Sequence, residues 1–389
     1  MPPRVLFIDH TGALGGAELY LLDVVRRYEA SARVITFEEG PFCERLRADG
    51  LDVQVAAAPP ALLQVEKGGA LRQGLRAVPG VLRLAGRLAR TARSFDVIYA
   101  NSQKALVVGA LAGLFARRPV IWNLHDMLTA DHFSAVNRRL GVLWANHLAD
   151  RVVVNSEATR RAFVESGGEE EKTALVYNGI DAAAFEDESG EDACCLRQNL
   201  GIEKEAPVVG VFSRLAEWKG QHVLLDALAR LPQQVHAVLV GEALFEADER
   251  YARRLRRRAR KSELNGRVHF LGFRDDVPAL MRGCDVVAHT SVAPEPFGRV
   301  IVEGMLAGCP VVAARAGGAR EIVDHRQTGL LVPPGDAAAL ARALRRLLEC
   351  PREAQALARR GRGMAKKRFS VERMRAAVHR HVRAVASPP

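Results

Sequence analysis

The sequence lacks several features that define common protein classes. No apolar run reaches about 18 residues, so no membrane-spanning helix is expected. Six cysteines are present, but none forms a C-x-x-C pair, and Cys194 and Cys195 are adjacent. This cysteine usage indicates a reducing compartment and argues against structural zinc. We expect a cytoplasmic protein, because the first residues, MPPRVLFID, predict a strand rather than a signal peptide.

Acidic residues are fewer than basic ones, at 45 Asp and Glu against 56 Lys and Arg, and the net charge is +11. The excess of arginine fits either a genome biased toward Arg codons or an anionic partner, such as a membrane surface, a phosphorylated acceptor or nucleic acid. The sequence has no basic platform interleaved with aromatic residues and no helix-turn-helix signal, so no nucleic-acid partner is expected. It does not indicate an oligomeric state.

Short apolar, β-branched runs alternate with helical patterns, which predicts buried parallel strands covered by helices. The expected strands are Arg4–Asp9, Arg33–Phe37, Val53–Ala56, Asp96–Ala100, Val120–Leu124, Arg151–Asn155, Thr173–Tyr177, Pro207–Phe212, Val235–Val240, Val268–Leu271, Asp285–His289 and Pro310–Ala314. The fold class is therefore α/β, with two doubly wound, Rossmann-like domains.

The length of 389 residues fits two domains. We expect an N-terminal domain over residues 1–184 and a C-terminal domain over residues 185–369, with a linker at Phe185–Asn199. A C-terminal helix over about residues 370–389 is expected to pack back on the first domain. Ligands of such sheets bind beyond the carboxyl ends of the strands, so we expect a central cleft that both domains face.

Two glutamates, Glu295 and Glu303, flank the start of a predicted helix in the run EPFGRVIVE. The first carboxylate lies on a loop, and the second lies about a turn and a half into the helix. Backbone N–H groups near Gly298 and Arg299 would point out of the helix start and form an anion site. The segment thus offers carboxylates for hydroxyl groups and a cradle for phosphate, as a nucleotide-sugar requires.

Glycines follow the first strand in the run HTGALGGAE, residues 10–18, and a helix is expected from Ala17 to about Tyr28. Glycines here allow a tight turn and the close approach of a phosphate to the helix start. Besides a phosphate site, the alternatives are a dinucleotide-binding loop, with Glu38 as the ribose ligand, and a tight turn alone. The spacing is not G-x-G-x-x-G, so the dinucleotide signal is weak.

A second loop, SRLAEWKG at residues 213–220, carries Arg214 and Lys219 between a strand and a helix. Both can reach one diphosphate, Arg through a planar fork and Lys as a mobile point charge. The alternative is a solvated pair, but cations are unfavourable near a helix N-terminus unless an anion lies there. Gly241 ends the next strand, and Phe273 opens a loop whose backbone would hold a base edge.

Residues 71–93 carry six arginines and no acidic residue. On a helical wheel the arginines share one face, and apolar residues lie mainly opposite, with an interruption at Pro79-Gly80. The arginines are Arg72, Arg76, Arg83, Arg87, Arg90 and Arg93, and the apolar residues are Leu71, Leu75, Val78, Val81, Leu82 and Leu88. The pattern fits either a solvated basic face or contact with an anionic inner membrane. The Arg250–Lys261 cluster is interpreted as a solvated helix face.

Together these residues resemble the GT-B fold retaining glycosyltransferases of family 4, the group 1 or glycogen synthase-like glycosyltransferases, over nearly the whole chain. The matching motifs are Gly15-Gly16-Ala-Glu18, Val154-Asn-Ser156, Asn178-Gly-Ile-Asp181, Arg214-Leu with Lys219-Gly220, Val268-His-Phe-Leu-Gly272, Glu295-Pro-Phe-Gly298, Glu303, Gly308-Cys-Pro-Val-Val312, Gly317-Gly318 and Glu321. Ser213 replaces the usual Gly before the Arg, and Gly304-Met-Leu replaces the common Ala-Met-Ala, but neither change removes a functional group.

The resemblance implies roles for individual side chains. Arg214 and Lys219 would bind the donor diphosphate, Glu295 the hydroxyls of the transferred sugar, and Glu303 the ribose. His125 matches a family His that touches the donor sugar, although a His at a strand end also fits a structural role. The implied donor-binding residues are Gly16, Gly241, Phe273, Phe297, Gly298, Arg299, Val300 and Glu303, and those on the acceptor side are Gly15, Glu18 and Asn101.

The resemblance also implies transfer with retention, in which the leaving diphosphate helps to deprotonate the acceptor. The expected donor is a UDP- or GDP-sugar, and the expected acceptor is a glycan or lipid-linked hydroxyl in cell-surface polysaccharide, glycolipid or glycoconjugate biosynthesis. No D-x-D motif follows a strand, so neither a metal nor another cofactor is expected. The alternatives are a nucleotide-sugar epimerase of similar fold and a nonenzymatic sugar-nucleotide binding protein. The motif series favours the transferase, at the membrane's inner face if residues 71–93 bind lipid.

Overall fold

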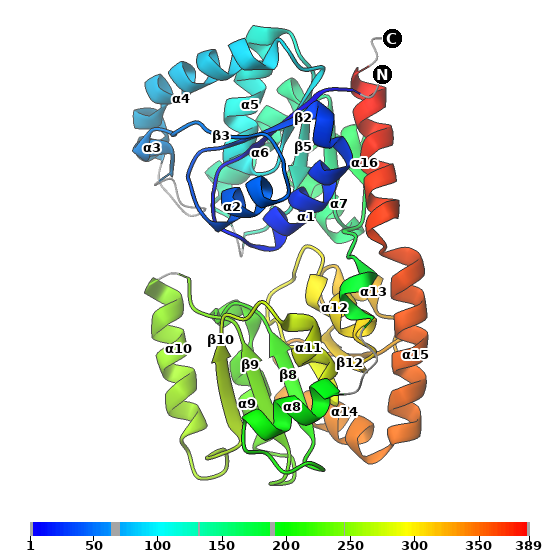
Figure 1. Ribbon diagram of the computed structural model, residues 1–389. Coiled ribbons are helices and arrows are strands. Elements are labelled where there is room, and N and C mark those ends of the chain that lie inside the picture. Colours follow the sequence, from blue (N-terminus) through cyan, green and yellow to red (C-terminus); the bar gives the residue numbers. More distant parts are fainter. Residues whose placement is uncertain (1–2, 64–70, 131–132, 187–190, 245, 387–389) are drawn as a thin grey trace. The chain divides into compact units, whose positions relative to one another are not determined.

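The computed structural model describes residues 3–63, 71–130, 133–186, 191–244 and 246–386, and the side chains of 71–75 and 191–194 lie outside this description. The chain divides into two compact units (Figure 1). Unit 1 comprises Met1–Gly179 and Val371–Pro389, and unit 2 comprises Ile180–Ser370. The first boundary lies a few residues before the expected one, and the last helix belongs to unit 1.

Unit 1 is built on a parallel sheet of seven strands in the order β3-β2-β1-β4-β5-β6-β7. The strands are β1 (Val5–Asp9), β2 (Ala32–Thr36), β3 (Val53–Val55), β4 (Val97–Ala100), β5 (Val120–Leu124), β6 (Arg151–Val154) and β7 (Thr173–Leu175). Most of their residues are buried because helices cover both faces of the sheet, which explains why continuous apolar runs predicted these strands.

The helices of unit 1 form two layers. One face of the sheet packs against α3 (Pro60–Leu63), α4 (Leu71–Ala92), α5 (Gln103–Ala116), α6 (Ala135–Leu148) and α7 (Glu157–Glu165). The other face packs against α1 (Gly16–Val25), α2 (Pro41–Ala48) and α16 (Val371–Ala386). Ser102, Ser134 and Ser156 cap α5, α6 and α7 by accepting backbone N–H bonds, which fixes where these helices begin.

The C-terminal helix α16 packs beside α1 in unit 1 (Figure 1). Its apolar residues Val371, Met374, Val378 and Val382 are buried in the same cluster as the residues of α1. On its polar side, Nδ1 of His379 lies 3.2 Å from the hydroxyl of Tyr28. The chain therefore returns to its first unit after completing the second.

Unit 2 is built on a parallel sheet of six strands in the order β10-β9-β8-β11-β12-β13. The strands are β8 (Val208–Phe212), β9 (His236–Val240), β10 (Val268–Gly272), β11 (Val286–His289), β12 (Val311–Ala314) and β13 (Leu330–Val332). The helices are α8 (Glu191–Asn199), α9 (Gln221–Leu228), α10 (Glu246–Ala259), α11 (Val277–Arg282), α12 (Arg299–Leu306), α13 (Ala319–Ile322), α14 (Ala337–Glu349) and α15 (Pro351–Arg368). α9, α10 and α14 share one apolar core with the sheet.

In both sheets the order of the strands reverses beside the first strand of the sheet, although all strands run parallel. In unit 1 this switch point lies between β1 and β4, and in unit 2 it lies between β8 and β11. Ligands of doubly wound sheets bind at the carboxyl ends of the strands that border such a point. Asp9 ends β1, Asn101 follows β4, Ser213 follows β8 and His289 ends β11, so both switch points are lined with polar side chains.

Every strand expected from the sequence forms, with ends shifted by at most two residues, but four other segments differ from expectation. The expected linker Phe185–Asn199 contains α8, which belongs to unit 2. Its Arg197 is buried, donates to the carbonyl of Gly283 and lies 2.6 Å from a carboxylate oxygen of Asp285. The acidic and small residues of this segment therefore concealed a packed helix.

Two further differences concern β13 and α4. β13 has three residues, a run too short to be distinguished from a loop by its pattern. α4 continues through Pro79 and Gly80 instead of being interrupted there. Gly80 is needed at this place, because a Cβ would lie 2.6 Å from the ring of Pro59. The first helix also ends earlier than predicted, at Val25, and a 3-10 turn over Arg26–Ser31 follows it.

Candidate functional site

A buried carboxylate, Glu295, is the centre of a polar cluster at the switch point of unit 2. Its Oε1 accepts hydrogen bonds from Nζ of Lys219, at 2.7 Å, and from the hydroxyl of Ser291. Nε2 of His289, the last residue of β11, lies 3.0 Å from the same oxygen. Glu295 is 6% exposed, so a predicted site residue from the loop before α12 meets Lys219 from the loop after β8.

These partners decide the charge of Glu295. Burial by itself raises the pKa of the carboxyl group, because the charged form loses its hydration. The attraction of Lys219 and His289, together with the hydrogen bond from Lys219, outweighs burial, and the pKa of Glu295 lies well below its ordinary value. The side chain is therefore an anionic hydrogen-bond acceptor at neutral pH.

The two predicted cations of this edge share an aromatic neighbour, Trp218. Nζ of Lys219 lies 4.2 Å from the centroid of the Trp218 ring, and the guanidinium carbon of Arg214 lies 6.0 Å from it. Arg214 also places Nε 3.4 Å from a carboxylate oxygen of Asp248 on α10. Attraction to the ring face offsets part of the repulsion between the two cations. Trp218 was missed by sequence reasoning, although it stands between them in the motif.

Neighbouring residues fix the shape of this loop. The amide of the buried Gln221 donates to the hydroxyl of Ser213 and to the carbonyl of Arg214. The hydroxyl of Thr290, which follows β11, donates to the carbonyl of Lys219 at 2.8 Å. Gly220 has φ +69°, and a Cβ there would lie 2.0 Å from the carbonyl oxygen of Thr290. The loops after β8 and β11 therefore pack together through a position that only glycine fits.

The start of α12 lies directly after Glu295 and has no side-chain cap. Gly298 is the N-cap residue at φ +100°, so the first N–H groups of the helix follow a residue without a side chain. Arg299 places Nε 3.4 Å from Oε1 of Glu303 one turn later. Phe297 is buried beside Phe369 of the same unit. No side chain therefore caps the first N–H groups of this helix, and the anion site expected there remains a prediction.

Two further predicted donor residues lie on the loops after β9 and β10. Gly241 has φ +126°, its N–H donates to the carbonyl of Gly272, and a Cβ would lie 2.2 Å from the carbonyl oxygen of Ser213. Gly241 therefore allows its loop to approach the loop of Arg214. Phe273 is 58% exposed, so its ring is available to a ligand.

In unit 1 the predicted glycine loop is closed by Glu18. Oε2 of Glu18 accepts the N–H of the N-cap residue Gly15 at 2.9 Å, which is one half of a capping box at the start of α1. Glu18 is buried, and its pKa rises to about 8 because of burial first and the nearby negative charge of Asp9 second. At neutral pH Glu18 is therefore mainly a neutral carboxylic acid.

The same loop shows why Gly12 is a glycine. Its Cβ would lie 2.4 Å from the backbone of Glu39, and its carbonyl accepts the N–H of Phe42. Close packing of two loops therefore accounts for this glycine. The packing supports the alternative of a tight turn at Gly12 over a dinucleotide-binding loop.

Asn101 and His125 meet in a hydrogen-bond network at the switch point of unit 1. Nδ2 of Asn101 donates to Oδ2 of Asp9 at 2.6 Å. Oδ1 of Asn101 accepts from Nδ2 of Asn123 and lies 2.9 Å from Nε2 of His125. The ring of Tyr20 packs edge-on against the imidazole. Asp9 and Asn123 were missed, although a polar residue at the end of a buried strand is a usable signal.

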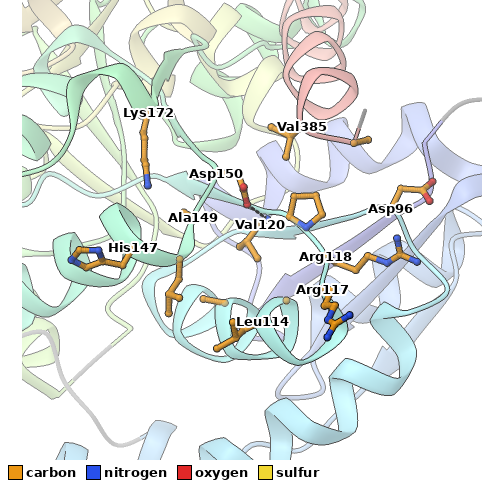
Figure 2. Close-up of a pocket in the computed structure, with 15 residues that line it drawn as sticks. Asp96, Leu114, Arg117, Arg118, Val120, His147, Ala149, Asp150, Lys172 and Val385 are labelled. Atoms are coloured by element: carbon orange, nitrogen blue, oxygen red, sulfur yellow. Dashed lines mark hydrogen bonds between the residues drawn. The ribbon is translucent and has the colours of Figure 1, made fainter. Parts of the chain in front are cut away.

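A cavity of about 780 Å³ lies elsewhere in unit 1, among residues near the amino ends of β5 and β6 (Figure 2). Three of its charged side chains form hydrogen bonds with nearby backbone groups. Asp150 accepts the N–H of Val120, Arg118 donates to the carbonyl of Arg93, and Lys172 donates to the carbonyl of Asn146. None of the predicted site residues lines this cavity. Its lining therefore gives no reason to place the candidate site there.

Among the described residues, no group of three or more His, Cys, Asp and Glu side chains is arranged to hold a metal ion. Within the same ranges, no helix is both long and apolar enough to cross a membrane.

Comparisons with known proteins agree with this arrangement. The profile of the family described as "Glycosyl transferases group 1" matches residues 195–364, and that of the "Glycosyl transferase 4-like domain" matches residues 15–179. The D-inositol 3-phosphate glycosyltransferase of Salinispora tropica is 29% identical over 368 residues, which is 87% of this chain and 74% of that protein. The lipopolysaccharide core biosynthesis glycosyltransferase LpsE of Rhizobium meliloti is 35% identical over 176 residues, 45% of this chain and 49% of LpsE.

A solved structure matches nearly the whole chain. The crystal structure of Anabaena HepE in complex with UDP and glucose is 43% identical, covers 98% of this chain and 100% of that chain, and superimposes with a TM-score of 0.89. The family expected from the motifs is thereby confirmed. Because this relative is matched over its whole length and the two profiles fall on the two units, the chain belongs to the group 1, family 4-like glycosyltransferases and has the GT-B fold.

Proposed function

We propose that the chain transfers a sugar from a nucleoside-diphosphate sugar to a hydroxyl acceptor, with retention at the anomeric carbon. The observation that carries this proposal is the cluster of Lys219, Arg214 and Glu295 beside the uncapped start of α12. It combines two cations for a diphosphate with a carboxylate for hydroxyl groups. The proposal is supported by the Anabaena relative, whose structures contain UDP with glucose and UDP-glucose.

The roles follow from the chemistry of each group. Lys219 has three N–H donors, of which one reaches Glu295, so the ammonium group can also bind a phosphate oxygen. Arg214 and the N–H groups after Gly298 would share the diphosphate. Glu295 would accept sugar hydroxyls, and Glu303, four residues into α12, would accept those of the ribose. The remaining donor contacts are assigned to Phe297, Arg299, Val300, Gly241 and Phe273.

Stabilisation of the leaving diphosphate would supply most of the catalysis. Negative charge grows on that group as the sugar leaves, and cations fixed beforehand stabilise it without reorganisation, with each donor worth a few kcal/mol in comparable sites. The leaving oxygen would take the proton of the acceptor hydroxyl on the same face of the sugar, so the new bond keeps the configuration of the old one. With Arg214 and Lys219 in this role, no metal is needed for the charge.

We assign the edge of unit 1 to the acceptor. His125, at the same edge, is assigned to contact with the donor sugar. Gly15, Glu18 and Asn101 are assigned to the acceptor and Gly16 to the donor, and the neutral carboxyl group of Glu18 can exchange hydrogen bonds with hydroxyl groups. Such groups suit the hydroxyls of a glycan or a lipid-linked sugar, as in the synthesis of a cell-surface polysaccharide, glycolipid or glycoconjugate. LpsE, a relative named for lipopolysaccharide core biosynthesis, supports this class of acceptor.

A thermal-shift screen with UDP, GDP, ADP and their sugars tests the donor. A ligand at 100 times its dissociation constant should stabilise the protein by about 2.7 kcal/mol. Incubation of the donor so found with candidate acceptors, followed by NMR of the anomeric proton, should show a retained configuration. An inverted product or strict loss of activity in EDTA would contradict the mechanism. Release of free epimerised nucleotide-sugar, or binding without any product, would instead favour the two alternative functions.

The α4 surface supports a position at an anionic membrane. We define it as the exposed residues Arg76, Val78, Leu82, Arg83, Arg87, Arg90 and Arg93. Val78 and Leu82 are each 46% exposed, whereas the sequence pattern placed them opposite the arginines. Leu71, Arg72 and Leu75 lie outside the described side chains. Exposed apolar groups among cations, with no acid on the helix, are typical of a surface that binds anionic lipid headgroups.

Liposome flotation tests this assignment. The double variant Arg83→Glu/Arg87→Glu should lose recovery with vesicles that contain anionic lipid, and neutral vesicles should recover little of either protein. The matched control is Arg253→Glu/Arg257→Glu on α10, which reverses two exposed charges in unit 2 and should leave recovery unchanged. Equal recovery of the native protein from neutral and anionic vesicles would remove the proposal.

A further inference from the structure

Within the residues that the structure describes, the hydrogen bonds and ion contacts of the Glu295 side chain all fall on one of its two oxygens. Lys219 and Ser291 donate to Oε1, and Nε2 of His289 lies 3.0 Å from it. Within the described part of the chain, Oε2 of Glu295 accepts no hydrogen bond. A carboxylate has acceptor positions on both oxygens, so this one-sided arrangement leaves half of a buried anion for another donor.

The backbone of Glu295 is held as firmly as Oε1. Its carbonyl accepts the N–H of Gly318 at 2.9 Å. Gly317 has φ +54°, and a Cβ there would lie 2.0 Å from the carbonyl oxygen of Glu295, so the following loop presses directly on this residue. With the main chain and one oxygen fixed, the direction of Oε2 is also fixed.

Burial of the His289 imidazole is energetically unfavourable unless its contact with the Glu295 carboxylate compensates. It is 4% exposed, and neither ring nitrogen makes a well-aligned hydrogen bond within the described ranges. A buried imidazole without such bonds costs free energy, and an apolar side chain at the end of β11 would avoid this cost. Its Nε2 contact with Glu295 is the interaction that compensates, and Ser291, which is 1% exposed, adds a donor two residues later.

We propose that His289 and Ser291 are positioning residues, which together with Lys219 hold Oε1 of Glu295 so that Oε2 is presented to the hydroxyls of the donor sugar. This inference rests on the proposed function, because it needs a nucleotide-sugar at this edge. It separates two tasks within one cluster. Arg214 and Lys219 govern the affinity for the nucleoside diphosphate, whereas His289 and Ser291 govern the additional affinity contributed by the sugar.

Isothermal titration calorimetry with UDP and with UDP-glucose measures the two tasks separately. Ser291→Ala and His289→Leu should weaken UDP-glucose binding about tenfold, the effect of one lost hydrogen bond to a charged group. UDP binding should change by less than about twofold, which also shows that each variant is folded. His289→Gln, whose amide can return an N–H near the position of Nε2, should restore most of the lost affinity.

The control is His236→Gln on β9, a half-buried histidine whose Nδ1 lies 3.1 Å from His269 instead of contacting Glu295. It should leave both affinities unchanged. Equal losses for UDP and UDP-glucose in the Ser291 and His289 variants would overturn the positioning role and assign these residues to the fold of unit 2. If the native protein binds neither compound, nor any pair from the donor screen, the proposed function fails, and this inference fails with it.

Discussion

Each unit places a buried glutamate near the switch point of its parallel sheet, but the pKa values of the two carboxyl groups are shifted in opposite directions. In unit 2 the pKa of Glu295 lies well below its ordinary value, and in unit 1 the pKa of Glu18 is raised to about 8. Burial raises the pKa at both sites. The difference comes from the neighbours, which are Lys219 and His289 for Glu295, and another carboxylate, Asp9, for Glu18.

This contrast shows that the same architecture is equipped for two kinds of ligand group. The edge of unit 2 holds a fixed anion beside two cations and so suits a charged diphosphate and the sugar attached to it. The edge of unit 1 keeps its glutamate neutral and joins Asn101, Asn123 and His125 through hydrogen bonds. Groups of this kind suit hydroxyls. The difference supports the proposal that the charged donor binds to unit 2 and the acceptor to unit 1.

The largest effect is expected from removal of one partner of the buried ion pair in unit 2. Lys219 and Glu295 have side chains that are 16% and 7% exposed. Glu295→Gln leaves the ammonium group buried without its anion, which should destabilise unit 2 by about 3 kcal/mol at pH 7. Urea unfolding measures this loss. Lys219→Met should cost a similar amount, because it leaves the carboxylate unpaired.

The double variant Lys219→Met/Glu295→Gln is the control for this pair. It should recover much of the stability lost by either single variant, and additive losses would contradict a direct pair. The pH dependence has a definite sign. The pKa of Glu295 is lowered in the folded state, so its contribution is complete above about pH 4.5 and is lost as the pH falls further. The difference between the native protein and Glu295→Gln should shrink over that acidic range.

The opposite pH dependence is expected for Glu18→Gln in unit 1. Between about pH 4.5 and 8 the folded state keeps a proton that the unfolded state has released. The native protein should therefore lose stability as the pH rises, at up to about 1.4 kcal/mol per pH unit from this group. Glutamine stays neutral, so Glu18→Gln should gain about 2 kcal/mol over the native protein between pH 6 and pH 8.

Urea unfolding at pH 6, 7 and 8 measures this gain for Glu18→Gln. The exposed Glu44 on α2 offers a matched control, and Glu44→Gln should follow the native protein at each pH. A constant difference between native protein and Glu18→Gln across the range would mean that Glu18 is ionised in the fold. The contrast between the two glutamates would then be broken.

The strands and the charged residues of these edges could be predicted from sequence, because buried parallel strands form continuous apolar runs and Glu295, Glu303, Arg214 and Lys219 stand in motifs. The opposite charges of Glu18 and Glu295 could not, since they depend on the burial of each side chain and, for Glu295, on Lys219 from the loop after another strand, β8. Asp9 ends a strand that the pattern located, but its partner Asn101 follows β4, and Lys219, the partner of Glu295, follows β8 rather than β11. β13 escaped detection because it has three residues.

The smallest effect concerns how unit 2 keeps two cations side by side. If the ring of Trp218 offsets the repulsion between Arg214 and Lys219, Trp218→Leu should weaken UDP binding by about 1 kcal/mol, roughly fivefold. Trp218→Phe keeps an aromatic face and should lose less than half of that amount.

Calorimetric titration with UDP at low and high salt distinguishes an electrostatic cause. Salt screens the two cations, so the difference in UDP affinity between the native protein and Trp218→Leu should be smaller at high salt. Equal losses for Leu and Phe would show that Trp218 acts through packing of the loop, since its carbonyl also accepts the N–H of Val292. In that case the ion pairs of Arg214 with Asp248 and of Lys219 with Glu295, rather than the ring of Trp218, would stabilise the cationic edge of unit 2.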